Sequence, residues 1–596
     1  MKKIQKHINI LLKTIGLVWK ASPSNMLGIF IINIIVGLVV PINLVVWKHF
    51  LDSIVRSLGN NDVIEVLFWL GVYSLLLILQ EGCIYISAYL KEMQSDYLNK
   101  HITEIMLTKT NSLQMIDFDN AKTYDNINKV TSEALSRSIS IISNTMELIK
   151  NSISIIGTVG ILISYNWIFI LISTIAYLPV IMVNLKIYEK LHEIYENRIE
   201  KLRLVENLKW IQIRYENIKE IRIFNAGDFL KNTITNIYVN YIDEDKKIRK
   251  NNLKTISFIN IIHYITSFVL KAIIVITSIE KKESIGSISM YITSLDTFQQ
   301  SLNTLITTFT GIYNDNLYVT TLFEFLDKES GGEKSSGNLN ITEFQSIEFR
   351  NVYFKYPNTE KYILENINFK IDNKKSYLLV GVNGAGKTTL IKLLCGLYKP
   401  TKGEILLNGI KMEEYKQEDV NKLFSAVFQD YIRYPLDIES NIKISDVEKW
   451  DNTSRMVYLV QKFGLENMIQ ELPYKYKTQL LNEWKDSTEL SGGQWQKLAI
   501  CRGLFAEASI LIMDEPTSAL DSQAENALLN SIKKISKDKL CIMISHRYTT
   551  ATMVDEIMVL ENKTIQEKGT FSCLMNKKGT FFSLFSLQAE KYRKND

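Results

Sequence analysis

Six long apolar segments lie in the first half of the chain, separated by stretches rich in charge. Each is about as long as the 20 residues that a helix needs to cross the hydrocarbon core of a bilayer. Because lipid offers no hydrogen-bond partner to an open backbone, such segments cross it as helices. We expect six transmembrane helices, of which the last is the least apolar. They begin near Met26, Ile64, Ile141, Trp167, Ile256 and Ile285.

The connections between these segments differ in length. Short connections follow the first, third and fifth segments, at 52–62, 165–166 and 280–283. The long stretches 91–137 and 186–254 keep a helical period and contain almost no Gly or Pro, which predicts helices that continue beyond the membrane. Lys and Arg are frequent before the first segment and in both long stretches. The positive-inside rule therefore places these stretches and both termini in the cytoplasm.

A different pattern begins at Phe344, where short β-rich runs alternate with helical stretches. This alternation predicts a mostly parallel sheet covered by helices. The stretch before it is rich in Gly, Ser and charged residues, as flexible linkers are. We therefore expect a membrane domain at 1–327, a linker at 328–343 and a second domain at 344–596.

Composition narrows the classes of protein. A chain of 596 residues exceeds the size of a single hydrophobic core. The net charge is only +5 and the Lys and Arg residues form no basic stripe, so we expect no nucleic-acid partner. The Lys-rich N-terminus precedes a full-length span without a small-residue cleavage site, so it is not a removable signal peptide. Scattered cysteines without C-x-x-C spacing indicate reduced thiols, at Cys83, Cys395, Cys501, Cys541 and Cys573.

The segment GVNGAGKTT, Gly381–Thr389, follows an apolar strand and opens a helix, which is the setting of a phosphate-binding loop. Its glycines let backbone N–H groups and the helix N-terminus converge on the phosphates of a nucleotide. Lys387 supplies a positive charge to the phosphates, and the Thr388 hydroxyl can ligate Mg²⁺. We expect ATP and Mg²⁺ as cofactors. The nucleotide-binding residues predicted in this segment are Gly381, Asn383, Gly384, Gly386, Lys387, Thr388 and Thr389.

Two acids, Asp514 and Glu515, follow the buried run 510–513. They lie at the carboxyl end of a predicted strand, where ligands of parallel sheets bind. One carboxylate can hold the metal while the next orients water, so we assign Asp514 to Mg²⁺ and Glu515 to the catalytic base. The predicted fold class is an α-helical polytopic membrane domain, with six transmembrane helices and long cytoplasmic extensions, followed by an α/β P-loop ATPase domain.

The segment LSGGQWQ, Leu490–Gln496, resembles the signature motif of ABC (ATP-binding cassette) ATPases. Other elements occur in this family's order. Tyr356 resembles the aromatic residue that stacks on adenine, and Gln429 the glutamine that joins the ATP site to the membrane domain. SALD, Ser518–Asp521, resembles the D-loop, and His546 the switch histidine that contacts the γ-phosphate. The resemblance implies catalytic roles for Gln429 and His546, a metal contact for Gln429 and an ATP contact for Asp521.

In this family the signature contacts ATP bound to the phosphate loop of another subunit. The resemblance therefore implies that Ser491, Gly493 and Gln494 bind the partner's ATP, with a helix N-terminus adding donors to the γ-phosphate. Since one chain carries one set of motifs, two chains must pair. We expect a homodimer, and a heterodimer with a second protein is the alternative.

The membrane half is similar to the six-helix domain of ABC exporters. FDNAKTYDNI, Phe118–Ile127, resembles the first coupling helix, 205–213 would lie near the second, and KEIRIFNAGD, Lys219–Asp228, resembles the segment that follows it. The stretch NEWKDSTE, Asn482–Glu489, departs from multidrug-type and lipid-type exporters, which carry an acidic and Gly-rich pattern there. FQDYIRYPLDIESNI and LSGGQWQ look closer to exporters encoded with natural products and peptides.

The combined hypothesis is ATP-driven export across the cytoplasmic membrane by a dimeric, multi-pass ABC transporter whose ATPase domain lies in the cytoplasm. Its partners are the lipid bilayer and an exported small molecule, peptide or lipid, and a peptide or natural product is the first choice of cargo. A multidrug or lipid exporter, or an ABC ATPase that works as a gate or sensor, is the alternative. Six spans conflict with a soluble ABC ATPase acting on ribosomes or DNA.

An acid inside the last span is a further candidate. Asp296 lies near the middle of that span, beside Gln299 and Gln300. Ionisable residues are costly inside a membrane and so are functional candidates. Asp296 could contact a polar or cationic cargo, it could form a helix–helix hydrogen bond, or it could belong to a wet, non-specific wall of the cavity.

Overall fold

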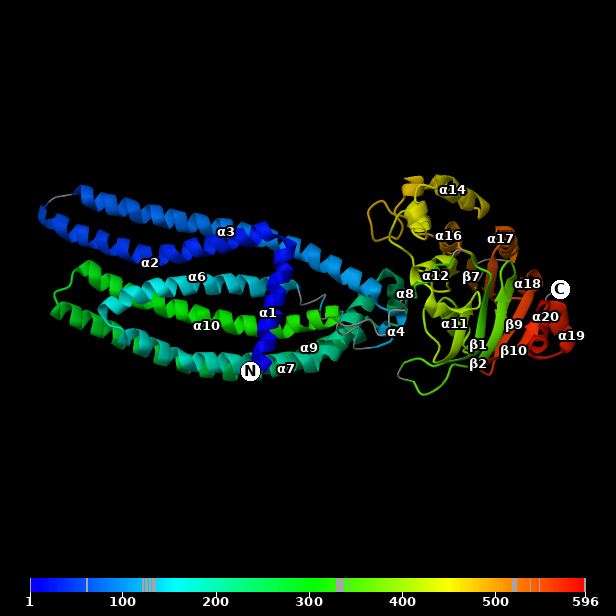
Figure 1. Ribbon diagram of the computed structural model, residues 1–596, viewed down its shortest axis with the longest axis horizontal. Helices are drawn as coiled ribbons and strands as arrows, with labels where there is room; N and C mark the ends of the chain where they lie inside the picture. The colour runs from blue at the N-terminus through cyan, green and yellow to red at the C-terminus, as the bar shows by residue number, and fades with distance from the viewer. Residues whose placement is uncertain are drawn as a thin grey trace. The chain divides into compact units, whose positions relative to one another are not determined.

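The computed structural model describes residues 2–60, 63–120, 123, 127, 130, 135–327, 337–341, 343–357, 359–516, 522–535, 537–545 and 547–593. The chain forms two compact units (Figure 1). The membrane unit contains residues 1–113 and 120–329, and the ATPase unit contains residues 330–596 together with the short segment Gln114–Asp119.

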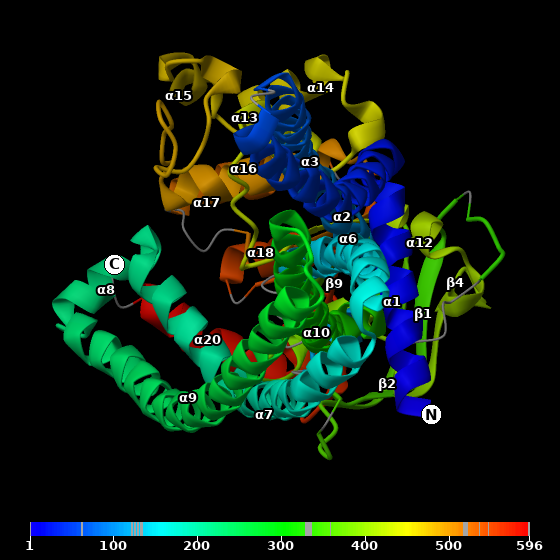
Figure 2. The same cartoon turned by 90° about the vertical axis from the view of Figure 1, so that its left-hand side faces the viewer.

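The membrane unit is built from long helices. Their bounds are α1 (Lys2–Ala21), α2 (Pro23–Asn60), α3 (Val63–Ser112), α6 (Leu135–Tyr165), α7 (Ile168–Ile213), α8 (Tyr215–Ile223), α9 (Gly227–Glu280) and α10 (Ile285–Asp327). The predicted helices beyond the membrane are present, because α3, α7 and α9 each have at least 46 residues. Figure 2 looks along the bundle, where α2 packs beside α3 and α7 beside α9.

Within the described residues, five helices are long and apolar enough to cross a membrane: α2, α3, α6, α7 and α9. α10, the sixth expected span, is long enough but less apolar. It packs against α2, α6, α7 and α9, and some of its polar side chains are buried by these neighbours instead of facing lipid, whereas Asp296 and Gln300 are exposed. The buried polar residues of α10 are Ser287, Ser294, Gln299, Ser301, Thr308, Thr310, Asp315 and Asn316. The predicted polytopic helical domain is confirmed.

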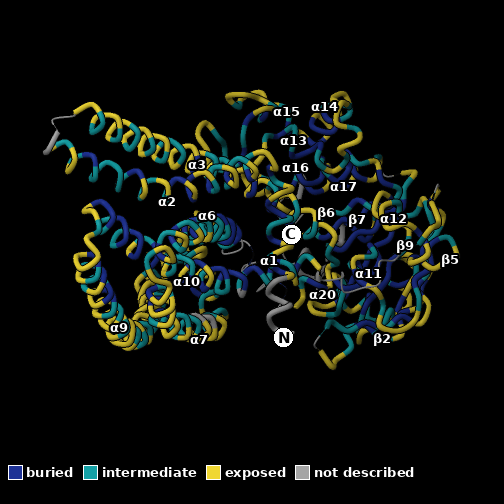
Figure 3. The backbone as a smooth tube through the Cα atoms, turned by 60° about the vertical axis from the view of Figure 1, so that its left-hand side comes forward, coloured by how far each residue is buried: buried dark blue, intermediate teal, exposed yellow. Residues whose placement is uncertain are grey.

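Many residues of α3 and α9 are exposed (Figure 3), and large apolar residues are among them. Ile78 is 70% exposed and Phe268 is 73% exposed, although both lie in the apolar stretches of their helices. An apolar surface of this extent needs a partner other than water. Lipid is such a partner, as expected for a protein that crosses the membrane repeatedly.

The ATPase unit contains two sheets. The four-stranded sheet is antiparallel and has the order β2-β1-β4-β5, and the six-stranded sheet has the order β10-β9-β3-β8-β7-β6. In the larger sheet all neighbouring strands are parallel except the edge strand β10. The strands are β1 (Ser346–Phe354), β2 (Leu364–Asp372), β3 (Ser376–Val380), β4 (Lys402–Leu407), β5 (Ile410–Lys411), β6 (Phe424–Val427), β7 (Ile510–Asp514), β8 (Leu540–Ile544), β9 (Glu556–Glu561) and β10 (Thr564–Gly569).

The six-stranded sheet is buried on both faces. Along β3, Leu378 and Val380 join one hydrophobic core, whereas Tyr377 and Leu379 join another. This alternation follows the period of two of a strand, and it explains why the sequences of the central strands β3, β7 and β8 are nearly continuous apolar runs. The helices of the unit are α4 (Met115–Phe118), α11 (Lys387–Leu394), α12 (Gln417–Leu423), α13 (Ile438–Lys443), α14 (Thr453–Lys462), α15 (Glu466–Glu471), α16 (Gly492–Phe505), α17 (Ser522–Ile535), α18 (Tyr548–Met553), α19 (Phe571–Lys577) and α20 (Thr580–Arg593).

Candidate functional site

Four neighbouring parallel strands, β3, β8, β7 and β6, bring the predicted site residues to one edge of the sheet. Gly381 follows β3, Glu515 follows β7, and Gln429 comes two residues after β6. Because the carboxyl ends of parallel strands meet at the same edge, three segments that are far apart in sequence converge there.

The phosphate-binding loop has the backbone that its glycines allow. Gly384 has φ 81° and Gly386 has φ 102°, both in the left-handed region, where side chains other than glycine are strained. A Cβ on Gly381 would lie 2.3 Å from the carbonyl oxygen of Leu560 in β9. The loop is therefore packed directly against the sheet, and α11 begins at Lys387 with its N-terminus at the loop.

We expect Gly381→Ala to destabilise the ATPase unit by about 1–3 kcal/mol, because the added methyl group forces the backbones of the loop and β9 apart. Thermal unfolding of the purified protein measures the loss. Gly492→Ala is the matched control, since, among the described residues, no atom apart from its chain neighbours and its own helix backbone lies within 4 Å of a Cβ built at that position. Equal unfolding temperatures for the two variants would contradict the packing argument.

The ammonium group of Lys387 lies inside this loop. Its Nζ donates hydrogen bonds to the carbonyl oxygens of Gly381 at 2.8 Å and Val382 at 3.2 Å. Burial lowers the pKa of Lys387, while the nearby carboxylates of Glu515 and Asp514 act in the opposite direction. The Lys387 ammonium therefore interacts both with the carbonyl groups of the loop and with the charges of the acid pair.

Asp514 is buried, with 7% of its surface exposed. Burial, together with the charges of Glu515 and Asp430, raises the pKa of Asp514 to about 6. Excess negative charge at a buried carboxylate suits a divalent cation, and the Thr388 hydroxyl and the Gln429 amide add neutral oxygen ligands of the kind that Mg²⁺ accepts. The residues present thus fit Mg²⁺, which would neutralise phosphate charge during hydrolysis.

Glu515 is held by two glutamines. Nε2 of Gln429 donates a hydrogen bond to Oε2 of Glu515 at 3.2 Å. Nε2 of Gln496 donates a hydrogen bond to the backbone carbonyl oxygen of Glu515, also at 3.2 Å. Glu515 also has φ 48°, a strained conformation for a residue with a side chain, which persists only where the surroundings impose it. Gln496 is in the signature helix α16, and no role was predicted for it from the sequence.

Tyr356 lies beside the start of α11. Its Oη is 3.0 Å from Oγ1 of Thr389, and its ring meets the ring of Tyr398 edge to face at 5.5 Å. The Nζ of Lys392 lies 5.9 Å from the centre of the Tyr356 ring. The predicted adenine-stacking residue is thus anchored to the phosphate-loop helix by its hydroxyl.

The signature segment caps a helix. Ser491 is the N-cap of α16, where its Oγ accepts from the Gln494 backbone at 3.3 Å and the Gln494 side chain accepts from the Ser491 backbone at 2.8 Å. This capping box fixes the first turn. Trp495, which is fully buried, anchors the helix in the core. Ser491 itself is exposed, so the N-terminus of α16 is accessible to an anion.

Two predicted site residues, Asp521 and His546, lie outside the described residues, as does the rest of the SALD segment. Their neighbours are described. β8 ends at Ile544, and the backbone N–H of Arg547 donates to Oγ of Ser545 at 3.1 Å. The roles of Asp521 and His546 therefore stay predictions.

A short segment from the first half of the chain is part of the ATPase unit. α4 and its flanks, Gln114–Asp119, group with this unit, and Oη of Tyr398 donates to Oδ2 of Asp119 at 2.7 Å. Tyr398 is only 4% exposed. Burial and the bond to Asp119 raise the pKa of Tyr398. The contact connects the first predicted coupling segment to the ring that packs against Tyr356.

The second predicted coupling segment does not form a separate short helix. Residues 205–213 are the last part of α7, which ends because Arg214 has an extended ψ of 131°. The separate short helix is α8, which overlaps the segment Lys219–Asp228. α8 buries none of its residues within the chain, and Tyr215 and Ile223 are largely exposed.

In the membrane unit, Asp296 of α10 pairs with Lys271 of α9 at 2.5 Å. Gln299 lies between helices, accepting from Ser267 at 2.9 Å and donating to Ser173 at 3.2 Å. A contact between helices, one of the alternatives predicted for Asp296, is therefore present, and a contact with cargo stays a prediction. Lys271 carries no local sequence signal for this contact, because its partner lies 25 positions along the chain.

The two units in one chain define a membrane protein that carries its own ATPase. The family model "ABC transporter transmembrane region" matches residues 26–302, and the model "ABC transporter" matches residues 364–518. The chain belongs to the ABC transporter family and is an ATP-hydrolysing transporter of the exporter type.

Relatives match over almost the whole length. "Subtilin transport ATP-binding protein SpaT" of Bacillus subtilis is 29% identical over 94% of this chain and 91% of its own. "Nisin transport ATP-binding protein NisT" of Lactococcus lactis subsp. lactis is 25% identical over 98% and 96%. The solved "Structure of a bacterial Atm1-family ABC exporter with ATP bound" has a TM-score of 0.78 at 20% identity, with 98% of each chain covered. The similarity to this solved structure shows that the chain has the fold of an ABC exporter.

Proposed function

We propose that this protein is a homodimeric exporter of a peptide or peptide-like natural product, driven by ATP hydrolysis on the cytoplasmic side of the membrane. The observation that carries the ATPase part is the convergence of Lys387, Asp514 and Glu515 at one sheet edge beside an ordered phosphate loop. In this proposal Lys387 and the loop bind the phosphates, and Tyr356 stacks on adenine. Asp514, Thr388 and Gln429 hold Mg²⁺, and Glu515 takes the proton of the attacking water.

The proposal uses a second copy of the chain. Ser491 and the exposed N-terminus of α16 can complete the site of the other copy, as the family resemblance implies. The exposed apolar residues of α8 give the membrane unit a surface for the ATPase domain of that copy. ATP then favours the closed pair over the open one, which is the differential binding that any ligand-driven change requires.

The choice of cargo rests on similarity. The names of the two relatives given above refer to transport of subtilin and nisin. The amino-acid sequences of the motifs also resemble those of natural-product and peptide exporters. A lipid or multidrug exporter is the competing proposal.

ATPase activity of the purified protein in lipid nanodiscs tests the cargo class. The panel contains nisin, subtilin, a phospholipid and a cationic dye. Stimulation by the peptides alone supports the proposal. Stimulation by the lipid or the dye alone would contradict it and would favour the competing class.

Tyr398→Phe tests coupling between the two units. The substitution keeps the ring against Tyr356 and removes only the hydrogen bond to Asp119, which, as a bond to a charged group, contributes about 1.5–3 kcal/mol. We expect basal ATPase activity to stay within about twofold, while stimulation by cargo falls by roughly tenfold, since 1.4 kcal/mol corresponds to a factor of ten.

Tyr415→Phe is the matched control. Tyr415 is also buried, and its hydroxyl donates to the carbonyl oxygen of Leu407 at 3.2 Å, away from α4. The control variant should keep its cargo stimulation. If Tyr398→Phe responds to cargo as fully as Tyr415→Phe does, the contact with Asp119 has no part in coupling.

A further inference from the structure

A cavity of about 280 Å³ lies in the ATPase unit at the amino-terminal edge of the six-stranded sheet. Its wall comes from the turn before β3, from α17, from the loop before β8 and from the end of α18. The nucleotide site uses the carboxyl ends of the same strands, so the two sites lie at opposite edges of the sheet. Five lysines line the cavity: Lys374, Lys375, Lys533, Lys537 and Lys539.

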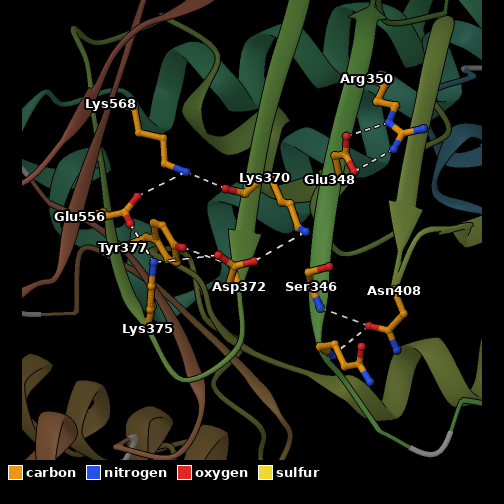
Figure 4. Close-up of polar contacts among 11 residues, drawn as sticks. Ser346, Glu348, Arg350, Lys370, Asp372, Lys375, Tyr377, Asn408, Glu556 and Lys568 are labelled. Atoms are coloured by element: carbon orange, nitrogen blue, oxygen red, sulfur yellow. Dashed lines mark hydrogen bonds and ion pairs between the residues drawn. The ribbon is translucent and has the colours of Figure 1, made fainter.

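The charges around this cavity are not balanced. Asp555 is the acid that lines it, and its Oδ2 already accepts from the backbone and the hydroxyl of Ser376 at 2.8 and 2.7 Å. Lys375 turns toward Glu556 at 3.0 Å and Asp372 at 3.9 Å (Figure 4). Lys533 donates to the carbonyl oxygen of Met553 at 3.0 Å.

The remaining lysines, Lys374, Lys537 and Lys539, form no ion pair with any residue in the described part of the chain. Lys539 is partly buried. The acid near it, Glu507, is occupied by Arg455 at 2.7 Å and Lys449 at 3.1 Å. Burial, and then the charge of Arg455, lower the pKa of Lys539 to about 8.

A solvated lysine cluster is the simpler interpretation of such a surface. It would leave every ammonium group in water, as Lys374 and Lys537 are. Lys539 differs because it is partly buried, in a cavity wall that also contains the apolar residues Leu529, Met543 and Val554. Taking a cation out of water is costly, and an anion in the cavity would lower that cost.

We propose that this cavity binds a soluble anion with two or more phosphate groups. Lysines act as point charges toward phosphate, and several lysines in the wall of one cavity match an anion with several charged groups better than a single carboxylate. The volume equals that of about nine water molecules. Phosphate on a lipid headgroup has the same chemistry, so the test separates the two sources.

The experiment measures the acylation rate of Lys539 by mass spectrometry, with the full-length protein in phosphatidylcholine nanodiscs and inorganic tripolyphosphate as the probe. Only the neutral amine reacts, and a bound anion favours the ammonium form. We expect tripolyphosphate to slow acylation about tenfold, the effect of raising the pKa by one unit. Because the readout belongs to Lys539, tripolyphosphate at the phosphate loop does not affect it.

The double variant Lys374→Gln/Lys537→Gln removes two exposed cations and keeps Lys539 as the reporter. In this variant tripolyphosphate should no longer slow the acylation of Lys539. The control Lys422→Gln/Lys462→Gln, which changes lysines outside the cavity, should keep the protection of Lys539. Unchanged acylation in the wild type, or equal protection in both double variants, would overturn the proposal. Protection that appears only when phosphatidylglycerol replaces phosphatidylcholine would assign the cavity to a lipid headgroup and would overturn the soluble anion.

Discussion

Glu515→Gln should lower the rate of ATP hydrolysis by about 10²–10⁴, the contribution typical of a general base, and should leave ATP binding close to wild type. The glutamine side chain has the same shape, and its carbonyl oxygen can still accept the hydrogen bond from Gln429. Only the ability to take a proton is lost. Phosphate release and binding of radiolabelled ATP measure the two quantities separately.

Glu418→Gln is the control, because Glu418 is exposed at the start of α12 and lies outside the site. It should hydrolyse ATP at the wild-type rate. Near-normal hydrolysis in Glu515→Gln would remove Glu515 from the role of base.

Lys387→Ala should weaken ATP binding instead of slowing hydrolysis of bound ATP. Loss of a hydrogen bond from a charged group costs about 1.5–3 kcal/mol, which is a ten- to hundredfold increase in Kd. The same change removes the bonds to the carbonyl oxygens of Gly381 and Val382, so the loop also becomes less ordered.

Equilibrium binding of a fluorescent ATP analogue measures the Kd of this variant. Lys422→Ala is the control, since Lys422 pairs with Glu448 on the surface of the ATPase unit. An unchanged Kd for Lys387→Ala would contradict the assignment of this lysine to the phosphates.

Local sequence patterns predicted most of the fold and much of the ATP site. Residues 377–380 of β3 and 510–513 of β7 are continuous apolar runs because both faces of the sheet are covered there, and the glycines of the loop specify a backbone that other residues avoid. Each motif is contiguous, so its geometry follows from a few adjacent residues. The helix cap at Ser491 likewise depends only on residues close in sequence, Ser491 and Gln494.

Contacts between distant residues could not be predicted in this way. Asp119 and Tyr398 are 279 positions apart, and nothing in either local sequence indicates the other. The ion pair between Lys271 and Asp296 depends on which faces of α9 and α10 meet. The end of α7 at Arg214 depends on a single backbone torsion, which the helical pattern through this stretch does not indicate.

The measurement that tests the central claim most directly is ATP-dependent uptake of a labelled peptide into inside-out membrane vesicles, with Glu515→Gln vesicles as the blank. The peptide is the member of the panel that stimulates ATPase activity most strongly. We predict that it accumulates inside wild-type vesicles when ATP is added outside, and that the variant accumulates none. ATP hydrolysis at the wild-type rate without accumulation would contradict export and would indicate a gate or a sensor.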